Sequence, residues 1–127
     1  MADDFPDYLN PVSRNTEGGA ITSYSFYLEI PGESGIYTDF PVVAEGCENI
    51  YQCLTISCND DSAIHLAELV RVSDLWLFFS VNFVTGGIFD FPGEALGAGQ
   101  TCRLYIYNNS ASTLTFSGAL NYVTRAI

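Results

Sequence analysis

Cys58, Asp61 and His65 lie close together in the sequence and combine a thiol, a carboxylate and the one histidine of the chain. A nucleophile beside a histidine that a carboxylate orients is the arrangement of a catalytic triad. The groups of a triad must converge in space, and closeness along a polar turn is weak evidence that they do. We therefore expect His65 to be an ordinary surface or strand-face residue, with no catalytic site in a protein that is not an enzyme.

Metal chemistry has few candidates. The cysteines are Cys47, Cys53, Cys58 and Cys102. They do not form the paired C-x2-C knuckles of a zinc site, and the first residues lack the features of a secretory signal, so we expect buried, reduced thiols. Asp60 and Asp61, with Asp39 or Asp90, offer carboxylates to calcium, but the spacing of an EF-hand loop is absent. We predict no metal and no cofactor.

Charge and hydropathy restrict the partners. Fifteen acidic residues against four arginines give a formal net charge of -11, which opposes binding to nucleic acid or to an anionic membrane. No apolar run reaches the roughly 18 residues of a membrane span. Only 15% of residues are charged and 48% are hydrophobic, which indicates that another subunit or a larger body covers part of the surface. Residues 95–127 contain no acid, which suits either an interface or a packed terminal hairpin.

Alternating apolar residues predict about eight short strands. Residues 75–84 should form the central strand of a sheet, with Leu75 and Leu77 on its apolar face. Further strands are expected at 21–30, 50–57, 101–107 and 113–124, and an edge strand or irregular extended segment at 36–43, which Pro41 interrupts. Residues 63–72 fit a strand or a short helix, and their position before 75–84 favours the strand. The pattern predicts an all-β, two-sheet β-sandwich over residues 21–127, either jelly-roll or immunoglobulin-like.

Residues 1–20 contain prolines, glycines and scattered acids without a sustained period, so we expect an extended N-terminal arm. Its large side chains, too sparse for a core, are Phe5, Tyr8, Leu9 and Val12. They suit docking on a neighbouring molecule, although a frayed terminus would have the same composition.

Four tyrosines fall at positions where strand alternation points the side chain outward: Tyr27, Tyr51, Tyr105 and Tyr107. Tyrosine combines a large contact area with a hydrogen-bonding tip, so such residues can anchor a protein interface or stack on sugar rings. They can equally cover sheet edges or meet the second sheet. Together with Arg103 and the large residues of the arm, they are our candidate interface.

The whole pattern resembles the cement or decoration proteins of tailed-bacteriophage capsids, which combine an arm, as in residues 1–20, with a compact acidic β-sandwich, as in residues 21–127. The resemblance implies a structural virion protein, made in the host cytoplasm, that forms homotrimers and stabilises the major capsid protein lattice from the outer surface. The alternative is a carbohydrate-binding β-sandwich module of a phage fibre or extracellular enzyme, which would use the outward tyrosines with or without calcium.

Overall fold

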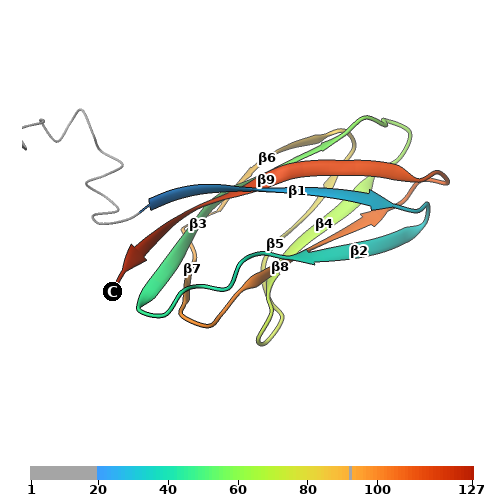
Figure 1. The fold of residues 1–127 in the computed structure, drawn as a ribbon. Helices are drawn as coiled ribbons and strands as arrows, with labels where there is room; N and C mark the ends of the chain where they lie inside the picture. Colours follow the sequence, from blue (N-terminus) through green and yellow to red (C-terminus); the bar gives the residue numbers. More distant parts are fainter. Residues whose placement is uncertain (1–19, 92) are drawn as a thin grey trace, which may run out of the picture.

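The described part of the chain is built from β-strands. A computed structural model describes residues 20–91 and 93–127, and in these residues it contains nine strands and no helix. The strands are β1 (Ala20–Ile30), β2 (Ser34–Asp39), β3 (Cys47–Cys58), β4 (His65–Arg71), β5 (Trp76–Phe83), β6 (Gly86–Asp90), β7 (Ala95–Gly97), β8 (Cys102–Asn108) and β9 (Leu114–Ala126) (Figure 1). No helix that could span a membrane is found in these two stretches.

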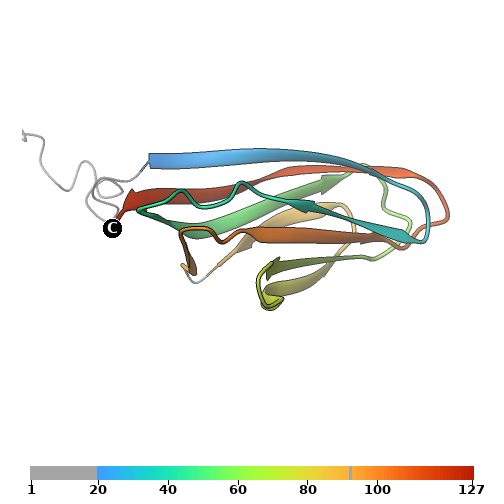
Figure 2. The ribbon, with the colours of Figure 1, turned by 60° about the horizontal axis from the view of Figure 1, so that its bottom comes forward.

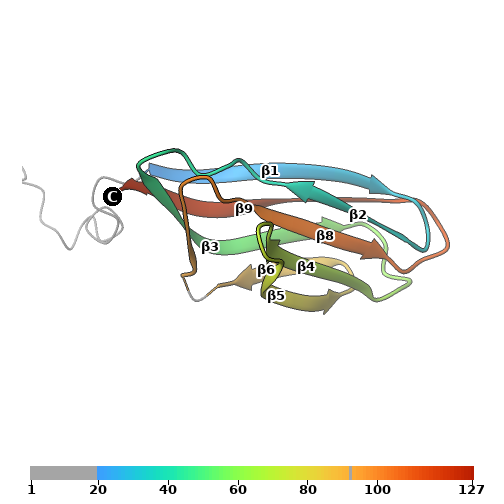
Figure 3. The ribbon, with the colours of Figure 1, turned by 90° about the horizontal axis from the view of Figure 1, so that it is seen from below.

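The strands form two antiparallel sheets, which confirms the predicted sandwich. One sheet has the order β1-β9-β3-β6, with β7 also paired to β3, and the other has the order β2-β8-β4-β5. Strand pairs are nested in the sequence: β1 pairs with β9, β2 with β8, β3 with β6, and β4 with β5. This is the order of a jelly roll, so the structure decides between the two predicted topologies. Figures 2 and 3 show the elongated sandwich, with β1 and β2 along one side and β5 and β6 along the other.

The core lies between the sheets, where alternate side chains of each strand meet. On β8 the predicted inward residues Cys102, Leu104 and Ile106 are fully buried. On β9, Phe116 and Leu120 are fully buried as well, and edge-to-face contacts join Phe116 to Phe83 of the opposite sheet. Burial of this kind stabilises the fold by about 25 cal/mol for each Å² of apolar surface removed from water.

Residues 65–71 form a strand, β4, that pairs with β5 as expected. The side chains that face the core are His65, Ala67 and Leu69, whereas Leu66 faces outward and Ile64, before the strand, is 60% exposed. Of the two expectations for His65, the strand-face one is confirmed and the surface one is wrong, because His65 lies on β4 and is fully buried.

The prediction that residues 75–84 form a central strand is wrong. β5 is the edge strand of its sheet, and both Leu75 and Leu77 are exposed. A β-bulge interrupts its pairing with β4, since Val70 lies opposite Leu77 while Leu69 lies opposite Phe79. Phe78 is the extra residue, and a bulge reverses the alternation of side chains on either side of it.

The edge strand predicted near Pro41 is confirmed as β2, which ends at Asp39. Residues 1–19 and 92 lie outside the described residues. The predicted arm, with Phe5, Tyr8, Leu9 and Val12, therefore stays a prediction.

Candidate interaction surfaces

His65 and Cys58 are both buried side chains. The His65 ring packs against Phe83 and Phe116, and its Nδ1 accepts a hydrogen bond from the backbone N–H of Asn109 at 3.2 Å. Its Nε2 has no hydrogen-bond partner among the described residues. Burial lowers the pKa of His65 and raises the pKa of the Cys58 thiol. Both shifts favour neutral forms, whereas a thiolate is the species that attacks substrates. The shifts therefore do not favour an activated thiolate beside a charged imidazole, and the expectation of a protein that is not an enzyme stays a prediction.

Asp60 acts within its own turn. Its carboxylate accepts a hydrogen bond from the backbone N–H of Ser62 at 3.1 Å and another from the hydroxyl of Ser62, and these bonds lower its pKa. Within residues 20–91 and 93–127, no three histidine, cysteine or acidic side chains lie close enough to hold a metal ion.

The outer face of the β2-β8-β4-β5 sheet gathers tyrosine and aliphatic side chains. Tyr37 of β2 pairs with Tyr105 of β8, and Tyr107 pairs with Leu66 of β4. Because Cys102, Leu104 and Ile106 face the core, the residues between them face outward. We call this surface the tyrosine face; its principal residues are Tyr37, Leu66, Leu77, Arg103, Tyr105 and Tyr107.

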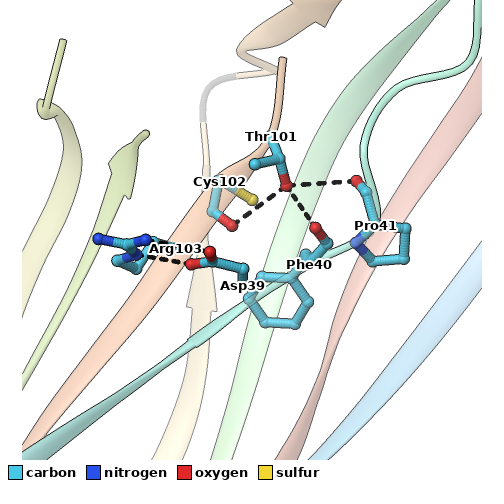
Figure 4. A network of polar contacts seen from close by, with 6 residues as sticks. All are labelled: Asp39, Phe40, Pro41, Thr101, Cys102 and Arg103. Atoms are coloured by element: carbon cyan, nitrogen blue, oxygen red, sulfur yellow. Dashed lines mark hydrogen bonds and ion pairs between the residues drawn. The ribbon is translucent and has the colours of Figure 1, made fainter. Parts of the chain in front are cut away.

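An ion pair holds one corner of the tyrosine face. Arg103 donates from Nε to Oδ1 of Asp39 at 2.6 Å and from Nη2 to Oδ2 at 3.0 Å (Figure 4). The Arg103 guanidinium carbon also lies 4.0 Å from the centroid of the Tyr37 ring. The hydrogen bonds from Arg103 lower the pKa of Asp39. The pair neutralises both charges and, through the cation–π contact, fixes the position of an exposed tyrosine.

A glycine fixes Tyr105. A Cβ at Gly35 would lie 2.1 Å from the Tyr105 hydroxyl oxygen, so the tyrosine side chain lies across the glycine of the neighbouring strand. A ring that covers an edge glycine in this way protects the strand and is itself restrained. Tyr105 and Tyr107 are therefore half-buried, whereas Tyr37 is 57% exposed.

The predicted interface residues do not form one surface. Arg103, Tyr105 and Tyr107 lie together on the tyrosine face, as alternation predicted, but Tyr27 of β1 is on the other sheet. Tyr51 is buried, with 1% of its surface exposed, so the expectation that its side chain points outward is wrong, and it meets Phe78 of the second sheet instead. The cause is a β-bulge in β3: Tyr51 pairs with Tyr122 and Cys53 with Asn121, which leaves Gln52 as an extra residue.

The outer face of the β1-β9-β3-β6 sheet is chemically different. Ser25 of β1 pairs with Ala119 of β9, which pairs in turn with Thr55 of β3. We call this surface the serine face; it includes Ser23, Ser25, Thr55, Ser57, Ser117 and Asn121. Ile21, Tyr27 and Ile88 are large exposed side chains on it, so most of the face is short, polar and uncharged.

The hairpin between β4 and β5 lies where the sequence predicted it, but the exposure of its large side chains was not predicted. Leu75 is 65% exposed and has a positive φ of 59°, and Trp76 is 43% exposed. Arg71 donates hydrogen bonds to Asp74, from Nε to Oδ1 at 2.8 Å and from Nη2 to Oδ2 at 2.7 Å. These bonds lower the pKa of Asp74 to about 2. The available signal was the polar character of Arg71, Ser73 and Asp74. A polar turn can lead into an exposed edge strand as well as into a buried central one.

The sequence did not predict that Tyr37 belongs to this surface, because Pro41 indicated an irregular segment. The available signal was the spacing of Tyr37 and Asp39, which places both side chains on one face of a strand, and Asp39 is the partner of Arg103.

Comparison with known proteins identifies the fold. No family model matches the chain, and no curated protein matches its sequence. The structure of the Yersinia pseudotuberculosis-derived mitogen is similar with a TM-score of 0.53 at 16% identity, covering 80% of this chain and 84% of the mitogen. PirA is similar with a TM-score of 0.51 at 11% identity, covering 78% of this chain and 94% of PirA. A family 35 carbohydrate binding module from Clostridium thermocellum gives 0.47 at 13%, covering 88% and 95% of the respective chains.

The likenesses to the mitogen and to PirA show the fold alone: the chain is a two-sheet β-sandwich protein. One fold serves many unrelated functions, so function must be argued from the surfaces.

Proposed function

We propose that this chain is a structural virion protein, a capsid cement or decoration protein that binds the outer surface of the major capsid protein lattice and stabilises it. The tyrosine face is the observation that carries the proposal. Its three tyrosines, with Leu66 and Leu77, offer a broad contact surface built on a rigid sheet. Tyrosine and arginine are enriched at protein interfaces, where they supply most of the binding energy.

The charge distribution supports a protein partner. The chain carries a net charge of -11, yet Asp39 and Arg103 neutralise each other on the tyrosine face. Glu68 remains, and its Oε2 accepts a hydrogen bond from the Ser80 hydroxyl at 3.4 Å. A surface with so little unpaired charge loses little hydration energy when a protein covers it. Trimers that form on the capsid, as in the cement proteins that the sequence resembles, are part of the same proposal.

The test is co-sedimentation with capsid shells, of the virus that encodes the chain, assembled without it. We expect the full-length chain to bind the shells and to raise the temperature at which they come apart. The double variant Tyr105→Ala/Tyr107→Ala should bind at least tenfold more weakly, because it removes two anchors of the face. Ile88→Ala, which removes a 72% exposed side chain of the serine face, is the control and should bind normally. Equal binding by all three proteins would contradict the proposal.

A second candidate, a carbohydrate-binding module, draws on the same face. Tyr105 lies in one cross-strand row with Glu68 and Ser80, so an aromatic ring and hydrogen-bonding groups are neighbours there. Sugar rings stack on aromatic faces while their hydroxyls bond to neighbouring polar groups. A glycan screen with the full chain tests this candidate. Binding that the Tyr105→Ala variant loses would favour it over the capsid role, and a screen without a hit at millimolar glycan would remove it.

A further inference from the structure

Three of the four sheet edges carry features that hinder pairing with another strand. β2 has six residues and runs into Pro41 two positions after it ends. β6 has five residues, two of them glycine. β5 is interrupted by the bulge at Phe78. Short length, proline and bulges are the usual means by which proteins protect exposed edges.

β1 has none of these features. It runs for eleven residues, pairs with β9 along its whole length without a register shift, and contains no proline. Glu29 is its one charged residue, so residues 20–28 form an uncharged edge in a chain with a net charge of -11. Ile21 and Tyr27, exposed to 65% and 71%, flank this edge. A long, uncharged edge without a bulge is a template for another strand.

The backbone groups along this edge can be assigned from the neighbouring strands. The N–H of Ala119 donates to the hydroxyl of Thr55 at 3.0 Å, so the polar backbone groups of Ala119 face β3. Directly opposite residues of an antiparallel pair exchange either both hydrogen bonds or none. Ser25 lies opposite Ala119, so its N–H and C=O point away from β9, towards the free edge.

Alternation extends this orientation along β1 to Ile21, Ser23, Tyr27 and Glu29. In the described part of the chain, β9 is the one strand that pairs with β1. The free edge therefore presents a regular row of backbone donors and acceptors.

We propose that this edge pairs antiparallel with β1 of a second copy of the chain, joining the two β1-β9-β3-β6 sheets across a two-fold axis. A two-fold contact brings the same surface of both copies together. Two acidic surfaces would repel each other, whereas the uncharged edge of β1 can pair with its own copy. A register centred on Ser25 places Tyr27 opposite Ser23 of the second copy and Glu29 opposite its Ile21. The two Glu29 side chains then lie at opposite ends of the ladder. The proposal does not depend on the capsid role.

The native mass of the full chain in solution tests the proposal. We expect about twice 13.9 kDa, the mass of one chain. Ser25→Pro removes a backbone donor that points off the edge, and proline is tolerated on an edge strand when its nitrogen faces away from the sheet. This variant should be folded by circular dichroism and have the mass of a monomer. Ser25→Ala keeps the donor and should remain a dimer.

Should Ser25→Pro fail to fold, a pair of lysine variants gives the same information. Ser25→Lys places two like charges opposite each other across the proposed axis and should weaken the dimer at least tenfold. Ser57→Lys adds the same charge to an exposed position of the serine face on β3, which is not an edge strand, and should leave the dimer intact.

Several results would overturn the proposal. One is a chain that is monomeric at millimolar concentration, and another is a trimer. The third is a dimer that persists in both the Ser25→Lys and the Ser25→Pro variants. A full chain that is monomeric but dimerises when residues 1–19 are removed would show that its own N-terminal segment occupies the edge instead.

Discussion

The outward side chains of β8 are Arg103, Tyr105 and Tyr107, whereas those at the centre of β9 are Ser117, Ala119 and Asn121. Both strands lie inside their sheets, and both send fully buried side chains into the same core. The core therefore requires apolar inward side chains from both sheets, and it does not explain why their outward side chains differ.

That difference separates two kinds of contact. On the tyrosine face, Tyr105 lies across Gly35 and the Asp39–Arg103 pair positions its neighbours, so a partner would bind through these large side chains. On the serine face, short side chains leave the backbone edge of β1 accessible and offer binding through the main chain. One protein can thus meet two partners without competition between them.

The largest effect should come from a methyl group at Gly118, in the sheet that carries the serine face. A Cβ there would lie 1.8 Å from the carbonyl oxygen of Thr55, a backbone atom of the neighbouring strand. We expect Gly118→Ala to lower the free energy of unfolding by about 3 kcal/mol, because overpacking forces the backbone to shift. Urea denaturation measures this loss.

Gly35→Ala is the matched change in the other sheet. The obstacle there is the hydroxyl end of Tyr105, a side chain that can rotate outward. The loss of stability should be about 1 kcal/mol or less, with Tyr105 displaced from the tyrosine face. Equal losses for the two variants would contradict the difference between a rigid backbone obstacle at Gly118 and a movable side-chain obstacle at Gly35.

Acid should act through the inner side of the sheet that carries the tyrosine face, at His65. Burial lowers its folded-state pKa below the ordinary value of 6.5, with the charge of Asp60 opposing the shift. The neutral form stabilises the fold above pH 6.5, and this stability is lost as the pH falls from 6.5 towards the folded-state pKa, by at most about 1.4 kcal/mol per pH unit.

Thermal unfolding between pH 7 and pH 5 measures the loss. His65→Gln retains a hydrogen-bond acceptor for Asn109 and should flatten the pH dependence over this range. A wild-type protein whose stability does not change between these pH values would contradict the assignment.

A smaller, opposite effect is expected at the hairpin that joins β4 to β5. Leu75 has a φ of 59° and is largely exposed, so its side chain adds strain and buries little surface. Leu75→Gly should raise the free energy of unfolding by up to about 1 kcal/mol, because glycine adopts this conformation without a steric cost. Differential scanning calorimetry should show a slightly higher Tm, and a lower one would indicate that the leucine packs in solution.

The smallest effect should follow from Asp39→Asn on the tyrosine face. The Asp39 side chain is 42% exposed, so loss of its pair with Arg103 should cost less than about 1 kcal/mol. The pair lowers the pKa of Asp39 below 3.8, so its contribution is present above that pH and is lost as the pH falls through the folded-state value. Urea denaturation at pH 7 and pH 3 should show a difference between wild type and variant at pH 7 that shrinks at pH 3.

The sequence was sufficient wherever a strand alternates without interruption. In β8, alternation correctly placed Leu104 in the core and Tyr105 and Tyr107 outside. It failed at two β-bulges. The bulge at Gln52 reversed the expected direction of Tyr51, and the bulge at Phe78 reversed the expected direction of Leu77.

A bulge depends on the strand opposite, through a register that no local pattern records. The position of β5 failed for a related reason. Its hydrophobic content predicted a central strand, but β5 lies at an edge, where the bulge directs Phe78 and Phe79 into aromatic contacts with Tyr51, Phe89 and Phe91.

By itself, the sequence determined the all-β class, the approximate strands and the scarcity of charge, because each depends on local periodicity or on composition. Only the tertiary structure decided the jelly-roll order, the separation of Tyr27 from Tyr105, and the position of β1 at the edge of its sheet. These depend on which strands become neighbours, and that choice is made by non-local pairing and core packing.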